Sequence, residues 1–158
     1  MLDRIEIDSI DRRILEELQR DARLPMSLMA DRVGVSAPAC YRRIRRLRDG
    51  GVILRETAVV RPRALGWTLT MLVLITLERE GVRTIDEIRQ KMEVEPAVLE
   101  AWQIAGEYDL AVRVIARDME EYDELTQRLF VEDGSVRMFK TFVVFKQLKM
   151  AAIIPALD

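Results

Sequence analysis

The hydrophobic residues recur with two different spacings along the chain, and the change follows the glycine pair Gly50-Gly51, about a third of the way along. Before the glycine pair Gly50-Gly51, apolar positions recur every three or four residues, as at Ile10, Ile14 and Leu18, which is the spacing of one face of a helix. Later segments such as TMLVLITLE (70–78) alternate and are β-branched, which is typical of strands. We therefore predict a helical front half followed by a mixed α and β back half.

Two helices are predicted before the first glycine of the chain. The first covers residues 8–20, and Asp8 is placed to cap its N-terminus. The second is short, follows Ser27 and ends at Gly34, because glycine readily adopts the left-handed conformation that closes many helices. The residues of this second helix expected to face inward are Leu28, Met29 and Val33.

A third helix is predicted from its capping residue, Ser36, to Asp49, with Pro38 in the first turn, where a missing N–H costs little. Its expected core face consists of Cys40, Ile44 and Leu47. The following segment VILRETAVVRP (52–62) alternates, which predicts a strand or a small hairpin. Together these elements predict a winged helix-turn-helix.

The back half has the order strand, helix, strand, strand, helix, strand, which fits a ferredoxin-like βαββαβ sandwich. The predicted strands are residues 70–78, 98–105, 110–117 and 136–149. The C-terminal tail AAIIPAL is expected to add an edge strand. The predicted fold class is therefore α+β, with one domain over residues 1–62 and a second over residues 63–158.

The first predicted strand of the sandwich is apolar on both faces, because Met71, Val73 and Ile75 alternate with other apolar residues. Helices cover only one face of such a sheet, so the other face needs a cover, and the same sheet of a second subunit fits best. The residues expected on this second face are Phe139, Val143, Phe145 and Trp102. The alternative is that the C-terminal tail covers it.

Composition removes several classes of function. The chain has no histidine and a single cysteine, Cys40, so it lacks the commonest general base, the commonest metal ligand and any thiolate-rich zinc site. A lone cysteine forms no internal disulfide, which fits a reducing, cytoplasmic setting. No apolar run approaches the ~20 residues of a membrane span. We expect no cofactor, no metal, no membrane contact and no enzymatic activity; an enzyme would have to use Asp109, Glu107 or Asp123.

Charge is distributed unevenly along the chain. Residues 1–63 hold 14 arginines and no lysine against 10 acidic residues, a net charge of +4. The remaining 11 basic and 17 acidic residues give −6. Five of the arginines lie between residues 42 and 48, on the third predicted helix and outside its core face. A basic front half joined to an acidic back half indicates two modules with different partners.

The arginine-rich helix has the features of a recognition helix that enters the major groove of double-stranded DNA. Arginine pairs with phosphate oxygens and also binds guanine edges in a bidentate manner. The first turn is small and uncharged, which permits close approach to base edges. We expect Ser36, Pro38, Ala39 and Arg42 nearest the bases, with Ala37 in the same turn, and Tyr41, Arg43, Arg45, Arg46 and Arg48 nearer the phosphates. The alternative is a metabolite-binding ferredoxin-like module whose basic helix contacts a protein partner.

Five segments together resemble the Lrp/AsnC family, the leucine-responsive regulatory protein and its relatives. They are IDSIDRRILEELQRDAR (7–23), LMADRVGVS (28–36), YRRIRRLRDGGVI (41–53), AGEYDLAVRV (105–114) and KTFVVFKQLK (140–149). The resemblance implies a bacterial or archaeal transcription factor that binds DNA through its N-terminal winged helix-turn-helix. It also implies that the C-terminal sandwich forms a homodimer and that dimers assemble further, up to an octamer of four dimers.

The resemblance also implies a small amino acid ligand, bound between subunits, that alters assembly or DNA binding. The effector-site residues that it implies are Gly106, Glu107, Tyr108, Asp109 and Thr141. Glycine lets a ligand approach the backbone, and Asp109 is suited to pair with an ammonium group. Family members often carry threonine before this glycine, whereas this chain has Ala105, which leaves the identity of the effector open. An ordinary turn between two strands is the alternative interpretation of this loop.

Overall fold

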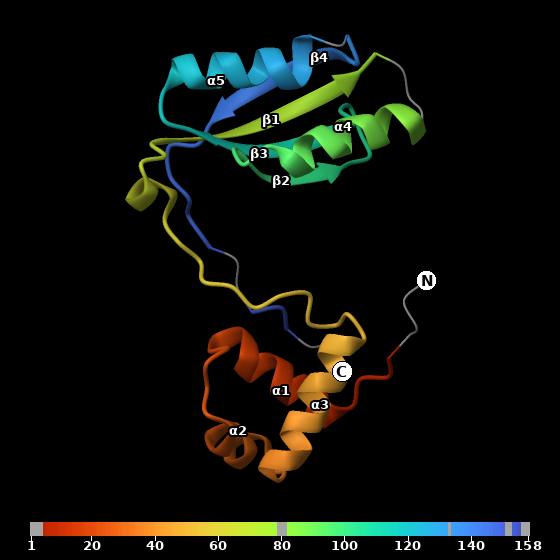
Figure 1. The fold of residues 1–158 in the computed structure, drawn as a ribbon, viewed down its shortest axis with the longest axis vertical. Coiled ribbons are helices and arrows are strands. Elements are labelled where there is room, and N and C mark those ends of the chain that lie inside the picture. Colours follow the sequence, from red (N-terminus) through yellow and green to blue (C-terminus); the bar gives the residue numbers. More distant parts are fainter. Residues whose placement is uncertain (1–4, 79–81, 133, 151–152, 156–158) are drawn as a thin grey trace. The chain divides into compact units, whose positions relative to one another are not determined.

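The computed structural model describes residues 5–78, 82–132, 134–150 and 153–155, and the chain forms two compact units (Figure 1). The first unit comprises the residues up to Val59 together with the C-terminal residues from Lys149. The second comprises Val60–Leu148. Among the helices described, none combines the length and the hydrophobicity that crossing a bilayer requires.

The first unit contains the three predicted helices, α1 (Ser9–Arg20), α2 (Met26–Val33) and α3 (Ala37–Asp49). Asp8 caps α1 as predicted, because its carboxylate accepts hydrogen bonds from the N–H groups of Ile10 and Asp11. Gly34 ends α2 in the left-handed conformation, at a φ of 79°. Ser36 occupies the N-cap position of α3, although its side chain makes no capping hydrogen bond.

The core of the first unit lies between these three helices. Its most deeply buried side chains are Ile14, Met29, Val33, Cys40, Ile44 and Leu47. The three from α3 are those that the helical spacing predicted. The prediction for Leu28 was wrong, since its side chain is 47% exposed. Successive helical residues differ by about 100° in direction, so Met29 and Ala30 take the inward face of α2 and Leu28 turns outward.

The predicted strand or hairpin of the wing was wrong: the described residues from Gly51 to Arg61 form no strand. The segment is extended and exposed, with Leu54 at 89%. An alternating pattern becomes a strand only where a partner strand completes its hydrogen bonds, and this segment has none. A short 3₁₀ helix, η1 (Pro62–Leu65), precedes the sheet of the second unit.

The predicted edge strand in the C-terminal tail was also wrong for its described residues, 153–155. The Ile154 N–H instead donates to the side-chain oxygen of Gln19 on α1 at 2.7 Å. In return, the Gln19 side-chain amide donates to the Ile154 carbonyl at 3.3 Å. The side chain of Gln19 thus binds both backbone groups of one tail residue. The rest of the predicted tail strand lies outside the described residues.

The second unit is a four-stranded antiparallel sheet with two helices packed on one face (Figure 1). Its elements are β1 (Leu69–Leu77), α4 (Val82–Val94), β2 (Val98–Gln103), β3 (Leu110–Ala116), α5 (Met119–Thr126), a π-helical turn η2 (Gln127–Val131) and β4 (Val136–Val143). The strand order is β2-β3-β1-β4, as the βαββαβ prediction requires. β4 is shorter than predicted, because its pairing with β1 ends where Val143 lies opposite Met71.

The strand register determines which side chains meet the helices. Met71, Val73 and Ile75 of β1 are fully buried beneath α4 and α5. Phe139 of β4 lies opposite Ile75, so it shares the helix-covered face, and its ring centre is 5.3 Å from that of Phe130. Burial of such large apolar side chains is the main source of stability for this layer.

The uncovered face of the sheet differs in part from the prediction. Phe139 and Val143 were wrongly assigned to it, because both lie opposite buried residues of β1 and so share the helix-covered face. Phe145 lies beyond the end of β4. Trp102 is on the uncovered face as predicted, opposite Ala111. We call this uncovered side of the sheet the open face. Its exposed large apolar residues are Leu72, Trp102, Met138 and Phe142.

Candidate nucleic-acid interface and ligand loop

One side of α3 presents polar and cationic side chains to solvent. Tyr41, Arg42 and Arg45 are exposed, and so are Ser36 and Pro38 at the start of the helix. Because the Ser36 hydroxyl does not cap its own helix, it remains available to an outside partner. The helical spacing of the sequence determines this surface, because burial of Cys40, Ile44 and Leu47 turns the remaining positions of α3 outward.

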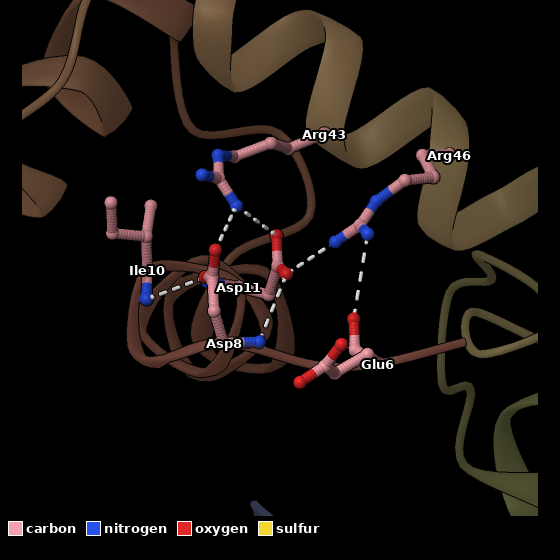
Figure 2. A network of polar contacts seen from close by, with 6 residues as sticks. All are labelled: Glu6, Asp8, Ile10, Asp11, Arg43 and Arg46. Carbon is pink, nitrogen blue, oxygen red and sulfur yellow. Dashed lines mark hydrogen bonds and ion pairs between the residues drawn. The ribbon is translucent and has the colours of Figure 1, made fainter. Parts of the chain in front are cut away.

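The two arginines on the α1 side of α3 are bound by carboxylates of that helix (Figure 2). The Arg43 guanidinium donates to Asp8 at 2.7 Å and to Asp11 at 2.9 Å. The Arg46 guanidinium donates to the other oxygen of Asp11, and at 3.4 Å to the backbone carbonyl of Glu6. The Asp11 side chain has no exposed surface, whereas that of Arg43 is 25% exposed. One buried carboxylate therefore holds two cations.

Asp8 and Asp11 also cap α1 reciprocally. Asp11 donates its N–H to the Asp8 carboxylate, and its own carboxylate accepts from the Asp8 N–H at 3.2 Å. The bond from the Asp11 N–H, followed by the bond from Arg43, lowers the pKa of Asp8 to about 2. The same contacts, first with Asp8 and then with Asp11, raise the pKa of Arg43. Helix capping and helix–helix pairing thus use the same two carboxylates.

The remaining arginines of α3 have weaker or more exposed partners. Arg45 lies 3.6 Å from Asp49, and both side chains are largely exposed. Arg48 binds Glu56, in the segment after α3, at 2.6 Å. Within the described part of the chain, Arg42 has no carboxylate partner. Exposed ion pairs contribute little to stability and exchange readily with solvent.

The loop between β2 and β3 contains four of the five predicted effector residues. Gly106 has a φ of 151°, and no atom lies within 4 Å of where a Cβ would stand. The Asp109 carboxylate accepts a hydrogen bond from the Leu77 N–H at 2.7 Å, which ties the loop to the end of β1. The Lys140 ammonium lies 5.6 Å from the ring centre of Tyr108, and its interaction with Tyr108 raises the pKa of Lys140. Glu107 is exposed to solvent.

A polar cavity of about 280 Å³ adjoins this loop. Its lining residues are Leu77, Ile85, Gln103, Ile104, Ala105, Gly106 and Asp109. Gly106 and Asp109 both line this cavity, whereas Glu107 and Tyr108 do not. Gln103 and Ile104 also line the cavity, although they were not predicted from the sequence. Their position at the end of a strand, just before the loop, could have indicated that they lie beside it.

Thr141 does not reach this cavity. It lies opposite Val73 on the helix-covered face of the sheet, and its hydroxyl is hydrogen-bonded to that of Tyr122 on α5. Burial raises the pKa of Tyr122. In the described ranges no group of three or more Asp, Glu, Cys or His side chains is arranged to hold a metal ion.

Comparison with known proteins matches both units. Residues 7–48 match the AsnC-type helix-turn-helix domain, and residues 70–154 match the Lrp/AsnC ligand binding domain. The chain belongs to the Lrp/AsnC family. It is similar to an uncharacterized HTH-type transcriptional regulator of Sinorhizobium fredii, with 37% identity over 96% of this chain and 89% of that protein. It is also similar to the leucine-responsive regulatory protein of Rhizobium meliloti, with 32% identity over 96% of this chain and 97% of that protein.

Among solved structures, the chain is similar to a feast or famine regulatory protein from M. tuberculosis complexed with L-methionine. The two share 27% identity and a TM-score of 0.83, over 94% of this chain and 100% of the other. Members of this family are transcriptional regulators and not enzymes. The chain is therefore a transcriptional regulator with a helix-turn-helix DNA-binding module and a ligand-binding sandwich.

Proposed function

We propose that α3 is the recognition helix of a cytoplasmic, sequence-specific regulator and that it binds double-stranded DNA. The proposed DNA-binding surface comprises Ser36, Ala37, Pro38, Ala39, Tyr41, Arg42, Arg43, Arg45, Arg46 and Arg48. The observation that carries the proposal is the exposed cationic side of α3 beside a small, uncharged first turn. We assign residues 1–62 to DNA binding and residues 63–158 to assembly and effector binding, with the docked tail around Ile154 as an accessory to the first module.

An electrophoretic mobility shift with a fragment from upstream of its own gene tests this proposal. We expect a shifted complex that an equal mass of an unrelated fragment does not displace. The variant Arg42→Ala is expected to weaken the complex strongly, whereas Arg89→Ala, on α4 of the second unit, is the matched control that removes the same side chain elsewhere. Equal binding by all three proteins would overturn the assignment of α3.

We propose that the open face of the sheet joins two copies of this chain. Its exposed side chains Leu72, Phe142 and Trp102 form an apolar surface of the kind that proteins bury between subunits. A dimer presents two recognition helices on one particle and so selects paired half-sites on DNA. Further assembly, up to an octamer of four dimers, would extend this to several sites.

Sedimentation velocity of the full chain tests the interface. The wild-type protein is expected to sediment as a dimer or a larger multiple of it. Phe142→Asp places a charge on the open face and is expected to yield monomers. Glu132→Lys, an exposed change beside η2, is the control and is expected to leave the assembly unchanged. A dimer that survives Phe142→Asp would place the interface elsewhere.

We also propose that the cavity beside the β2–β3 loop binds a small amino acid as the effector. Support comes from the unobstructed backbone at Gly106, the carboxylate of Asp109 and the similar regulator from M. tuberculosis that was solved with L-methionine. Glu107, Tyr108 and Thr141 remain proposed contributors, with Tyr108 directed toward Lys140. An amino acid that binds one assembly state better than another shifts DNA occupancy.

A thermal-shift screen of the twenty amino acids, L-methionine among them, tests this assignment, because a ligand of the folded state raises the melting temperature. Gly106→Val is expected to abolish the shift, since a branched side chain would occupy the approach to the cavity. A melting temperature that responds to no amino acid, or a response that survives Gly106→Val, would contradict the proposal that the β2–β3 loop forms the effector site.

A further inference from the structure

The five arginines of α3 differ in what already binds them. Arg43 and Arg46 point toward α1 and converge on the carboxylate of Asp11 (Figure 2). Arg42 and Arg45 lie three residues apart on another side of the helix and are exposed. Arg43 and Arg46 thus form a set bound to α1, although the Arg46 side chain keeps 45% of its surface exposed. Arg42 and Arg45 form a set that faces solvent, and Arg48, bound to Glu56, belongs to neither set.

Transfer of Arg43 and Arg46 to an external phosphate would leave Asp11 uncompensated. The Asp11 side chain has no exposed surface, and an unpaired carboxylate in such a position is strongly unfavourable. Its other contact, with the Asp8 N–H at 3.2 Å, does not replace two guanidinium groups. Both arginines are thus bound to the Asp11 carboxylate, which is buried and cannot be hydrated if they leave.

The opposite holds for the solvent-facing set. Arg45 gives up only an exposed contact with Asp49, at 3.6 Å, when it binds elsewhere. Arg42 gives up no ion pair within the described residues. Desolvation and lost pairing therefore oppose DNA contact much less for Arg42 and Arg45 than for Arg43 and Arg46.

We infer that Asp11 sorts the arginines of α3 into two roles. Arg42 and Arg45 contact DNA phosphates, whereas Arg43 and Arg46 are positioning residues that fix the angle of α3 against α1. This inference rests on the proposed function of α3 as a DNA-binding helix. It narrows the proposed surface, because two of its five arginines act through the fold and make no contact with phosphate.

Salt dependence separates the two roles, because each phosphate neutralised by a protein cation contributes about −0.9 to the slope of log affinity against log salt. The experiment uses the full chain and fluorescence anisotropy with a labelled duplex of mixed sequence, over a series of KCl concentrations. The double variants Arg42→Gln/Arg45→Gln and Arg43→Gln/Arg46→Gln remove equal charge from the same helix and so control for each other.

For Arg42→Gln/Arg45→Gln we expect the slope to become shallower by about 1.8, the share of two phosphates. For Arg43→Gln/Arg46→Gln we expect the wild-type slope, with affinity weakened by a similar factor at every salt concentration. Equal flattening of the slope by both double variants would overturn the inference while leaving the DNA-binding proposal intact. Absence of salt-dependent binding by the wild-type protein would instead overturn the DNA-binding proposal.

Loss of both α1-facing arginines threatens folding, so single variants complete the design. Arg46→Gln leaves Arg43 on Asp11, and Arg45→Gln is its neighbour with the same change in charge. Circular dichroism spectra are compared first to confirm that both fold. The slope is expected to fall by about 0.9 for Arg45→Gln and to stay constant for Arg46→Gln. A fall of the same size for Arg46→Gln would place its guanidinium on DNA.

Discussion

Asp11 of α1 and Arg43 of α3 are joined by a 2.9 Å hydrogen bond, although the Asp11 side chain has no exposed surface. The same carboxylate binds Arg46 and the N–H of Asp8, so one buried group connects the start of α1 to the middle of α3. The angle between these helices is consequently set by charge as well as by apolar packing.

Removal of this carboxylate should destabilise the first unit. We expect Asp11→Ala to lower the free energy of unfolding by about 2–3 kcal/mol, less than for a fully buried pair because Arg43 and Arg46 can still reach water. Urea denaturation followed by circular dichroism measures the change. Glu16→Ala, which removes only an exposed partner of Arg20 at 3.8 Å, is the control and should cost less than about 0.5 kcal/mol. Similar losses for the two variants would contradict a structural role for Asp11.

Acid should weaken the first unit through Asp8. Its pKa is lowered from 3.8 to about 2 in the folded chain, so the unfolded chain takes up the proton first as the pH falls. The contribution of Asp8 is therefore complete above about pH 4 and is lost as the pH falls toward 2. Melting temperatures of wild type and Asp8→Asn, compared on either side of this window, should converge at the acid end. A constant difference between them would show that Asp8 does not titrate as described.

Substitution of Gly34, in the turn between α2 and α3, should change stability only through the backbone conformation that this position requires. The residue has a φ of 79°, and no atom lies within 4 Å of a Cβ placed there, so substitution causes strain without a clash. We expect Gly34→Ala to cost about 1 kcal/mol and Gly34→Asn to cost less, because asparagine tolerates the left-handed region. Chemical denaturation of both variants measures the order. A loss for asparagine as large as that for alanine would point to a steric cause.

The hydroxyl pair of Tyr122 and Thr141 should be energetically coupled. Their hydrogen bond joins α5 to β4 beneath the helix layer, where Tyr122 is buried. In a double-mutant cycle of Tyr122→Phe and Thr141→Val we expect a coupling of about 1 kcal/mol. Strict additivity would mean that the two hydroxyls do not stabilise one another, and would leave Thr141 free for the effector role proposed for it.

Much of the secondary structure and core of the first unit could be predicted from sequence, because helix ends and buried helix faces depend on nearby residues. Helical spacing identified the buried face of α3, and Asp8 and Gly34 marked where α1 begins and α2 ends. The pairing of Asp11 with Arg43 could not be foreseen, since it joins residues 32 positions apart and depends on how two helices pack. Charge density on α3 alone therefore overstated the number of arginines free for a partner.

In the second unit the order of elements was predictable and the faces of β4 were not. A shift of one residue in register exchanges the two faces of a strand. Pairing with β1 places Phe139 under the helices, contrary to its predicted place on the uncovered face, and leaves Phe142 on that face. The predicted wing strand was wrong for a related reason. Its segment, which includes the exposed Leu54, has the residue types of a strand but no partner strand to pair with.

The two hydrogen bonds between Gln19 and Ile154 mean that the first unit includes a segment that follows the sandwich along the chain. During synthesis, Gln19 can bind Ile154 only after the intervening Val60–Leu148 unit has been translated. A purification tag added after residue 158 would follow closely in sequence on the segment that binds Gln19. Removal of such a tag by proteolysis is therefore advisable before operator affinity is measured.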